Sequence, residues 1–427
     1  MQAAGRYHSS EVQQKYRRRL CSQADPRARK PITNSLNRKS KRSPCLRLHQ
    51  GVYERKVWIT SAIGSPQIAQ ARAAEDMSNT YQHELQAACA AVRLAARLCT
   101  KVQLQLKAGE KQDKSDDSPV TIADYGSQAL VAYSLQSSLP SMQFSMVAEE
   151  DSADLRSQDS QAMADRITDE VNSILRQEDG APQLSKQAVL DLIDQGASQG
   201  GPQGRHWVLD PIDGTRGFVG LRQYAICLGL LDQGQVVLGV LGCPNLPQQP
   251  IQEEDGAAGV AERVGTEGIG CLFTAIKGQG AFVGPLNGRP PSSRLQLQDR
   301  SDFSQARFME SYESKHSDQS FTSKLAKELG VTAPPLRLDS QAKYGALARG
   351  DAAILLRFPH KGYREKIWDH AAGVVIVQEA GAVITDASGA PLELGQSRWL
   401  DIDRGIVTAT PKVHAAILKA ISKNSQD

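Results

Sequence analysis

The stretch Trp207–Phe218 constrains the fold more than any other part of the chain, because it joins a buried strand to a helix through two acids. Its apolar run Val208–Leu209 predicts the end of a buried strand, and Pro211 is expected to end the hydrogen-bond ladder because proline has no N–H. Gly214 and Thr215 predict a tight turn that opens a helix. Carboxylates, free backbone N–H groups and a hydroxyl group therefore converge on one spot.

The two acids of this stretch, Asp210 and Asp213, suit a divalent cation that holds a phosphate. Mg²⁺ takes oxygen ligands from one or two carboxylates and leaves its other positions to water and substrate phosphate. The N–H groups at a helix start favour an anion. The alternative interpretation is an Asp-Pro turn followed by a helix cap at Thr215, and the rest of the chain has to decide between the two.

The first 74 residues differ in composition from the rest. They carry 16 Lys and Arg residues against three acids, and no apolar segment typical of a secretory signal follows the basic clusters. This composition is typical of an organelle transit peptide, with a chloroplast favoured over a mitochondrion. The alternative is a disordered basic tail that binds polyanions, in which case a cytosolic location is expected.

The rest of the chain, 75–427, holds 34 basic and 44 acidic residues, a net charge of about −10. Such an acidic body argues against a general nucleic-acid surface, and no apolar run reaches the roughly 18–20 residues of a membrane helix. We therefore expect a monomer that binds neither nucleic acid nor membrane. The seven cysteines show no CxxC and no zinc-ligand spacing, which favours a reducing compartment over a disulfide framework.

Periodicity predicts alternating helices and strands after residue 80, and therefore sheets covered by helices. Helices are expected over 80–106, from 118 onward, and over 162–176, 186–195, 321–329, 341–348, 367–380 and 412–421. Strands are expected over 142–148, 224–231, 236–241, 271–276, 281–283, 352–357, 382–385 and 405–408. We expect an N-terminal α+β lobe over 75–250 and a C-terminal α/β lobe over 251–427, with 244–266 as a surface or inter-domain connection.

Further acids lie at the ends of predicted elements, namely Asp124, Glu149, Glu150 and Asp369. A single acid in such a place is most often a solvated cap. Asp369 is harder to interpret in this way, because Trp368 and a run of small apolar residues surround it. A carboxylate at a largely buried helix start needs a partner, and a metal ion supplies one.

Three acid-bearing motifs occur in a fixed order along the chain. They are Val147-Ala-Glu149-Glu, Asp210-Pro-Ile-Asp-Gly-Thr and Trp368-Asp369-His-Ala-Ala-Gly. Together they resemble the motifs of the lithium-sensitive, magnesium-dependent phosphatase superfamily of inositol monophosphatase and fructose-1,6-bisphosphatase. The segments that begin at Lys114, Asp339 and Arg357 narrow the resemblance to its plant-type 3′(2′),5′-bisphosphate nucleotidases. The resemblance covers about residues 77–425 and none of 1–74.

The resemblance implies a role for particular residues. It places metal ligands at Glu149, Asp210, the backbone carbonyl of Ile212, Asp213 and Asp369. It places the pair that orients and deprotonates the attacking water at Asp124 and Thr215. It places substrate contacts at Gly214, Thr215, His316, Ser340, Lys343, Arg357 and Asp369, with His316 in the least well matched surroundings.

The resemblance also implies an α+β layered sandwich of two lobes with the site between them. Two or three Mg²⁺ ions per site would activate the attacking water, with Thr215 relaying a proton to Asp124. The implied activity removes the 3′-phosphate of adenosine 3′,5′-bisphosphate to give AMP, and extends to 3′-phosphoadenylyl sulfate and inositol 1,4-bisphosphate. Lithium inhibition is implied in the same way.

Two alternatives remain open at this point. An inositol monophosphatase would share the metal site. It differs because a free 5′-phosphate on the substrate would not raise its kcat/KM. A catalytically silent protein that only binds the bisphosphate is the second alternative, although the intact set of acids speaks against it. The glycines of Gly278–Gly284 do not match a dinucleotide-binding fingerprint and predict a turn.

Overall fold

The computed structural model describes residues 80–108, 119–252, 256, 260–299, 302–304, 306–312, 319–359, 362–402 and 404–424. All of them lie in one compact unit, Gly64–Asp427. The predicted transit peptide, 1–74, falls outside the described residues. Within them, no helix is both long enough and apolar enough to cross a membrane.

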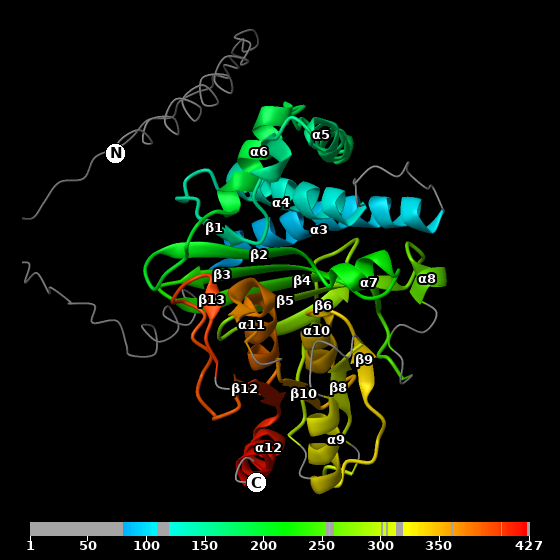
Figure 1. Ribbon diagram of the computed structural model, residues 1–427, viewed down its shortest axis with the longest axis vertical. Coiled ribbons are helices and arrows are strands. Elements are labelled where there is room, and N and C mark those ends of the chain that lie inside the picture. The colour runs from blue at the N-terminus through cyan, green and yellow to red at the C-terminus, as the bar shows by residue number, and fades with distance from the viewer. Residues whose placement is uncertain are drawn as a thin grey trace, which may run out of the picture. The chain divides into compact units, whose positions relative to one another are not determined.

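A seven-stranded sheet runs through the centre of this unit (Figure 1). Its strands follow one another in chain order: β1 Met146–Ala148, β2 Arg205–Asp213, β3 Ala225–Asp232, β4 Gln235–Pro247, β5 Ile269–Ile276, β6 Gly280–Pro285 and β7 Ser293–Leu295. β1 and β2 are parallel, and every later neighbour is antiparallel. The predicted hairpin of β3 and β4 is confirmed. The predicted boundary at residue 250 falls between β4 and β5, which pair with each other.

Both faces of this sheet are buried, which explains why its strands are apolar almost throughout. Alternate residues serve opposite faces: Ile226 and Leu228 of β3 join one core cluster, whereas Ala225 and Cys227 join the other. The first face is covered by α3 Gln82–Lys107 and α4 Pro119–Ser138, and α5 Gln161–Leu175 and α6 Lys186–Ile193 pack on α4. The side chain of Ser185 accepts a hydrogen bond from the N–H of Ala188, as expected of the cap of α6.

The second face packs against α10 Ala342–Arg349 and α11 Ala371–Glu379, as Figure 1 shows. Gly239 of β4 permits this close packing, because a Cβ there would lie 2.5 Å from the carbonyl oxygen of Ala372 in α11. Beyond these helices lies a five-stranded sheet in the order β12 Val383–Asp386, β14 Ile406–Ala409, β10 Ile354–Arg357, β8 Phe308–Ser311 and β9 Leu336–Leu338. Its outer face packs on α9 Gln319–Glu328 and α12 Pro411–Asn424.

The remaining described elements are short. They are α7 Thr215–Val219, α8 Val260–Arg263, the 3₁₀ helices η1 Asp154–Arg156, η2 Asp194–Gly196 and η4 Ile367–Asp369, and the antiparallel pair β11 Glu365–Lys366 and β13 Trp399–Leu400. Both larger sheets mix parallel and antiparallel pairs between layers of helices. The expected α+β layered fold is confirmed.

Two expectations about the sheet were wrong. β2 does not end before Pro211 but continues to Asp213, with a register shift between Asp210 and Asp213 that accommodates a residue without an N–H. The first part of the predicted connection 244–266 belongs to β4, which continues to Pro247 and pairs with Ile269 of β5. The proline and glutamine residues of this segment are typical of a loop, and its pairing partner β5 comes later in the chain, so the strand was not predicted.

Candidate active site

The end of β2 carries the two acids of the central motif. Asp210 is 2% exposed, and its Oδ1 accepts a hydrogen bond of 3.1 Å from the N–H of Ile212. Asp213 follows after the register shift, and its Oδ2 accepts a hydrogen bond from the N–H of Gln341 at the start of α10. The irregular strand end therefore brings both acids and the Ile212 peptide to one place.

The turn after β2 depends on Gly214. Its φ of 90° lies in the left-handed region, and a Cβ at this position would lie 2.8 Å from Cβ of Ser340. Thr215 begins α7 directly after this glycine, and the N–H of Phe218 donates to the Gly214 carbonyl at 2.9 Å. The predicted glycine turn into a helix is confirmed, and it sets Thr215 beside the loop that bears Ser340.

Buried amide side chains hold α7 in place. Gln103 of α3 donates to the carbonyl of Phe218 at 2.8 Å. Asn245 of β4 donates both to Gln103 Oε1 at 3.0 Å and to the carbonyl of Arg222 at 2.6 Å. Arg222 in turn pairs with Asp339 at 2.9 Å, directly before Ser340. The loops on the two sides of the site are thus fixed to one another.

Glu149 directly follows β1, the strand parallel to β2. The loop that it begins is held by Gln128 of α4, whose Nε2 donates to the carbonyl of Glu150 at 2.6 Å and whose Oε1 accepts from the Glu150 N–H at 3.1 Å. Asp124 lies one turn earlier on the same helix face and is buried. One face of α4 therefore supplies Asp124 and orients the segment of Glu149.

Asp369 ends η4, directly before α11. Gln341 fixes this segment, because its side chain donates to the carbonyl of Trp368 at 2.7 Å and accepts from the N–H of Gly373 at 3.1 Å. The hydroxyl of Tyr363 lies 3.5 Å from Asp369 Oδ2. Gln341 therefore connects Asp369 to Asp213, although neither acid is near the other in sequence.

The acids act on each other electrostatically, which shows that the structure brings them together. Burial, and then the charges of neighbouring carboxylates, raise the pKa of Asp124 and that of Asp210 well above their ordinary value. Burial raises the pKa of Glu149 to about 7, with Glu150 and Asp213 adding to it. Burial and the charge of Asp213 raise the pKa of Asp369 to about 7.

This donor set fits a hard divalent cation. All of its side-chain donors are carboxylate oxygens, the ligands that Mg²⁺ prefers, and none is a thiol or an imidazole. The pKa values of these carboxylates stay raised although nearby cations act against burial, so the acids need further positive charge, which bound cations supply. Glu149, Asp210, Asp213 and Asp369 are thus the residues that would hold Mg²⁺.

Two of the residues expected to contact substrate, Lys343 and Arg357, lie on α10 and β10. Lys343 is 8% exposed, and its positive charge and that of Arg357 both lower the pKa of Asp213 against the raising effect of burial. Ser340 directly precedes this part of the chain, has a φ of 65°, and accepts a hydrogen bond from the N–H of Ala342. Two cations therefore adjoin the acids, as a doubly phosphorylated substrate would require.

A buried network that the sequence did not reveal holds Arg357. Glu365 accepts from Arg357 Nε at 2.7 Å and from Arg357 Nη2 at 2.8 Å, and the ring of His370 contacts the same carboxylate at 3.1 Å. The other ring nitrogen of His370 lies 2.8 Å from the hydroxyl of Tyr344. Glu365 was part of a recognised motif, but only the fold shows that it reaches back to Arg357.

Glu365, Asp369 and His370 form a compact group of possible metal ligands among the residues that the structure describes, with ligand atoms within 4.8 Å of one another. Both oxygens of Glu365 are already engaged by Arg357 and His370. We therefore infer that Glu365 holds Arg357 and is not a metal ligand. His316 lies outside the described residues.

The comparison with family models identifies the family of this chain, and the sequence comparison identifies similar proteins. The model of the inositol monophosphatase family matches residues 76–426. A 3′(2′),5′-bisphosphate nucleotidase of Oryza sativa is 51% identical over 346 residues, 80% of this chain and 94% of that protein. The 3′(2′),5′-bisphosphate nucleotidase 1 of Arabidopsis thaliana is 52% identical over 343 residues, 80% of this chain and 96% of that protein. The solved structure of CysQ from Bacteroides thetaiotaomicron matches at 19% identity and a TM-score of 0.48, over 77% of this chain and 98% of that one.

Proposed function

This chain belongs to the inositol monophosphatase family, and we propose that within it the chain is a magnesium-dependent 3′(2′),5′-bisphosphate nucleotidase. The observation that carries this proposal is the identity of 51% and 52% to two plant nucleotidases over nearly their whole length. The reaction is hydrolysis of the 3′-phosphate of adenosine 3′,5′-bisphosphate to AMP. The same site is proposed to accept 3′-phosphoadenylyl sulfate and inositol 1,4-bisphosphate.

Our proposed mechanism assigns one task to each group of residues. Glu149, Asp210, Asp213, Asp369 and the Ile212 carbonyl would hold two or three Mg²⁺ ions, which supply positive charge for the phosphate oxygens and lower the pKa of water.

The chain's own residues orient the reactants. Thr215 accepts a proton from the attacking water and relays it to Asp124, the general base. The backbone N–H groups of Gly214 and Thr215 donate to the non-bridging oxygens of the phosphate. No covalent intermediate with the protein is required.

Selectivity for a second phosphate is proposed to come from the basic side of the site. Lys343 is buried, the side chain of Arg357 is 23% exposed, and Arg357 is held in one orientation by Glu365. Arginine suits a phosphate because its planar fork can donate two parallel hydrogen bonds. Ser340 and His316 complete the proposed substrate contacts.

The test is phosphate release by the full chain with Mg²⁺, comparing adenosine 3′,5′-bisphosphate, 3′-AMP and inositol 1-phosphate at matched concentrations. We expect the largest kcat/KM for the bisphosphate. Equal or better use of inositol 1-phosphate would instead indicate an inositol monophosphatase. Binding of the bisphosphate without any phosphate release would indicate a silent binding protein.

We also propose a location and an assembly state for this chain. The basic, acid-poor composition of residues 1–74 supports import into an organelle, with a chloroplast favoured because the similar proteins named above are from plants. A fusion of these residues to a fluorescent protein would test this proposal directly. We also propose that the enzyme acts as a monomer, which its mass in solution would test.

A further inference from the structure

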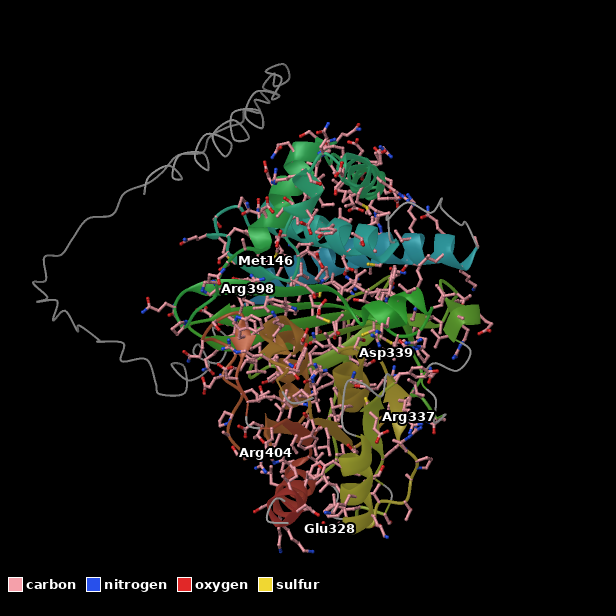
Figure 2. The ribbon with its side chains drawn as sticks, in the orientation of Figure 1. Met146, Glu328, Arg337, Asp339, Arg398 and Arg404 are labelled. Carbon is pink, nitrogen blue, oxygen red and sulfur yellow. The ribbon has the colours of Figure 1, made fainter. Side chains whose placement is uncertain are left out.

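Arg398 connects two segments that carry proposed metal ligands, although it is not itself an acid or a substrate contact. It directly precedes β13, and Figure 2 labels it beside Met146 of β1. Its guanidinium donates three hydrogen bonds to backbone carbonyls: to Ala148 at 2.5 Å, and to Gly196 and Ser198 at 3.0 Å each. The Ala148 carbonyl belongs to the peptide group that leads into Glu149.

The same residue also contacts the segment of Asp369. The carbonyl of Arg398 accepts a hydrogen bond of 3.2 Å from the N–H of Ile367. Its guanidinium lies over the ring of Trp368, 4.8 Å from the ring centroid. Ile367 and Trp368 form η4 together with Asp369. Arg398 therefore touches the residue before Glu149 on one side and the residue before Asp369 on the other.

Both acids follow short strands. Glu149 follows β1, a three-residue strand at the edge of the central sheet, whereas Asp369 follows β11, a two-residue strand that pairs only with β13 among the described strands. Short edge pairings fix a backbone weakly. Like charges push the acids apart until a cation binds between them. A contact that holds both segments would therefore lower the cost of forming the metal site.

We propose that Arg398 is a positioning residue of the metal site, which sets the distance between the segments of Glu149 and Asp369. This inference rests on the metal dependence of the proposed function and adds a residue to it. Arginine is required because its fixed fork of N–H groups can reach three carbonyls while its flat face stacks on Trp368. Lysine has a compact charge and no flat face, so it can replace only part of these contacts.

The test compares Arg398→Met and Arg398→Lys with a control beside the same strand pair, β11 and β13. Arg364 also stacks on a tryptophan, Trp399, but its guanidinium pairs with the exposed Asp401 and not with the carbonyls beside Glu149. Arg364→Met therefore removes a comparable side chain and leaves the contacts between the segments of Glu149 and Asp369 in place. Mn²⁺ binding to the full chain without substrate is measured by electron paramagnetic resonance, and phosphate release is titrated with Mg²⁺.

We expect Arg398→Met to weaken Mn²⁺ binding about 10- to 100-fold, the range typical when a residue that orients metal ligands is lost. The Mg²⁺ concentration for half-maximal activity should rise by a similar factor, while KM for the bisphosphate at saturating Mg²⁺ stays within about twofold. Arg398→Lys should fall between Arg398→Met and the wild type. Arg364→Met should match the wild type in every readout.

Unchanged Mn²⁺ affinity in both Arg398 variants, even with a lower melting temperature, would overturn the inference and leave Arg398 a purely structural residue. If Arg398→Met does not fold, Arg398→Lys carries the same comparison. A different result would contradict the proposed function: the wild type itself would then bind no Mn²⁺ or release no phosphate. Wild-type activity with unaltered metal binding in the variants would refute this inference alone.

Discussion

At the scale of single residues, Asp210 is an acid whose charge is unfavourable in the metal-free protein. It is almost fully buried, and four other carboxylates raise its pKa further. Asn has the same shape and can still accept the hydrogen bond from Ile212. We expect Asp210→Asn to raise the melting temperature in EDTA, to lose most of the stabilisation by Mg²⁺, and to reduce phosphate release by more than about 100-fold.

Thermal unfolding with and without Mg²⁺, together with a phosphate assay, checks this prediction. The rise in melting temperature in EDTA is the informative result, because replacing a residue with a structural role would lower the melting temperature. A metal-free Asp210→Asn protein that melts below the wild type would mean that the charge of Asp210 is stabilised by something other than a cation.

The raised pKa values of Glu149 and Asp369, each about 7, predict how stability depends on pH without metal. Between the ordinary carboxyl range and pH of about 7, the folded protein keeps protons that the unfolded chain has released. The contribution to stability is therefore complete below the ordinary pKa and is lost as pH rises through about 7. In EDTA, the urea midpoint should fall between about pH 5 and about pH 8.

Saturating Mg²⁺ should remove or reverse this slope, because the cations favour the charged carboxylates. The comparison needs only urea titrations of the same protein in the two buffers. Parallel pH profiles with and without Mg²⁺ would show that the acids do not face a bound cation.

Glu365 offers a test of substrate binding that leaves the metal ligands untouched. Its side chain is fully buried and accepts two hydrogen bonds from Arg357. Glu365→Gln leaves Arg357 without its countercharge, which we expect to destabilise the fold by about 3–5 kcal/mol and to raise KM for the bisphosphate. The effect on KM should be smaller for 3′-AMP, which lacks the second phosphate.

The matched control is Asp351→Asn, since Asp351 pairs with Arg349 in a similarly buried ion pair at the other end of α10. It should cost comparable stability and leave the ratio of the two KM values unchanged. If both variants alter that ratio equally, the effect of Glu365 comes from weakened folding and not from the orientation of Arg357.

At the scale of elements, the geometry of the site depends on the turn between β2 and α7. Gly214→Ala places a methyl group 2.8 Å from Cβ of Ser340 and also forces alanine to a φ of 90°. The backbone strain alone costs about 1–2 kcal/mol. We expect the contact with Ser340 to add to this cost and to displace Thr215, so that kcat falls more than stability alone explains.

Gly278→Ala separates the backbone strain from the effect of a side-chain contact, because Gly278 has a φ of 80° but nothing within 4 Å of an added Cβ. It should show the strain alone, with kcat unchanged. Urea unfolding and steady-state kinetics of the two variants are the measurements. Equal losses of stability, with kcat unaffected in both, would mean that the turn does not position Thr215.

The sequence predicted the long elements well, because their apolar patterns extend over several turns or strand residues. α3, α4 and the β3–β4 hairpin lie close to where periodicity placed them. β11 and β13 were missed, because a strand of two residues carries no readable alternation. The continuation of β2 past Pro211 was missed for another reason: proline predicts the end of a ladder, but an irregular strand end tolerates it.

The acids and substrate contacts were predicted from motifs, and Asp124, Glu149 and Asp369 act electrostatically on Asp210 at the end of β2. Arg398 and Glu365 were not predicted as site residues. Each acts through a partner distant in sequence or on the far side of a turn, and an arginine or a glutamate gives no sign of this by itself. Such connections depend on tertiary structure, which local patterns do not encode.

At the scale of the whole molecule, α3 is the first described helix and is needed for the packing of the central sheet. It buries twelve of its residues against the first face of the central sheet, and Gln103 connects it to α7. Its start is fixed by Tyr81, whose hydroxyl donates to Asp232 at 2.8 Å, and by the Thr80 carbonyl, which accepts from Gln279 at 3.1 Å. The family match begins only a few residues earlier, at residue 76.

We therefore expect a chain that begins at Glu75 to release phosphate at the rate of the full chain and to melt at the same temperature. A chain that begins at residue 109 should not fold. Each buried CH₂ group contributes about 0.8 kcal/mol, so the loss of a whole buried helix face exceeds the total stability of about 5–15 kcal/mol of a typical domain. Activity and thermal unfolding of the two shortened proteins check both statements.

Reduced activity of the chain that begins at Glu75, with an unchanged melting temperature, would assign the basic N-terminal residues a part in catalysis or substrate capture. The packing of α3 cannot explain a loss that is confined to turnover.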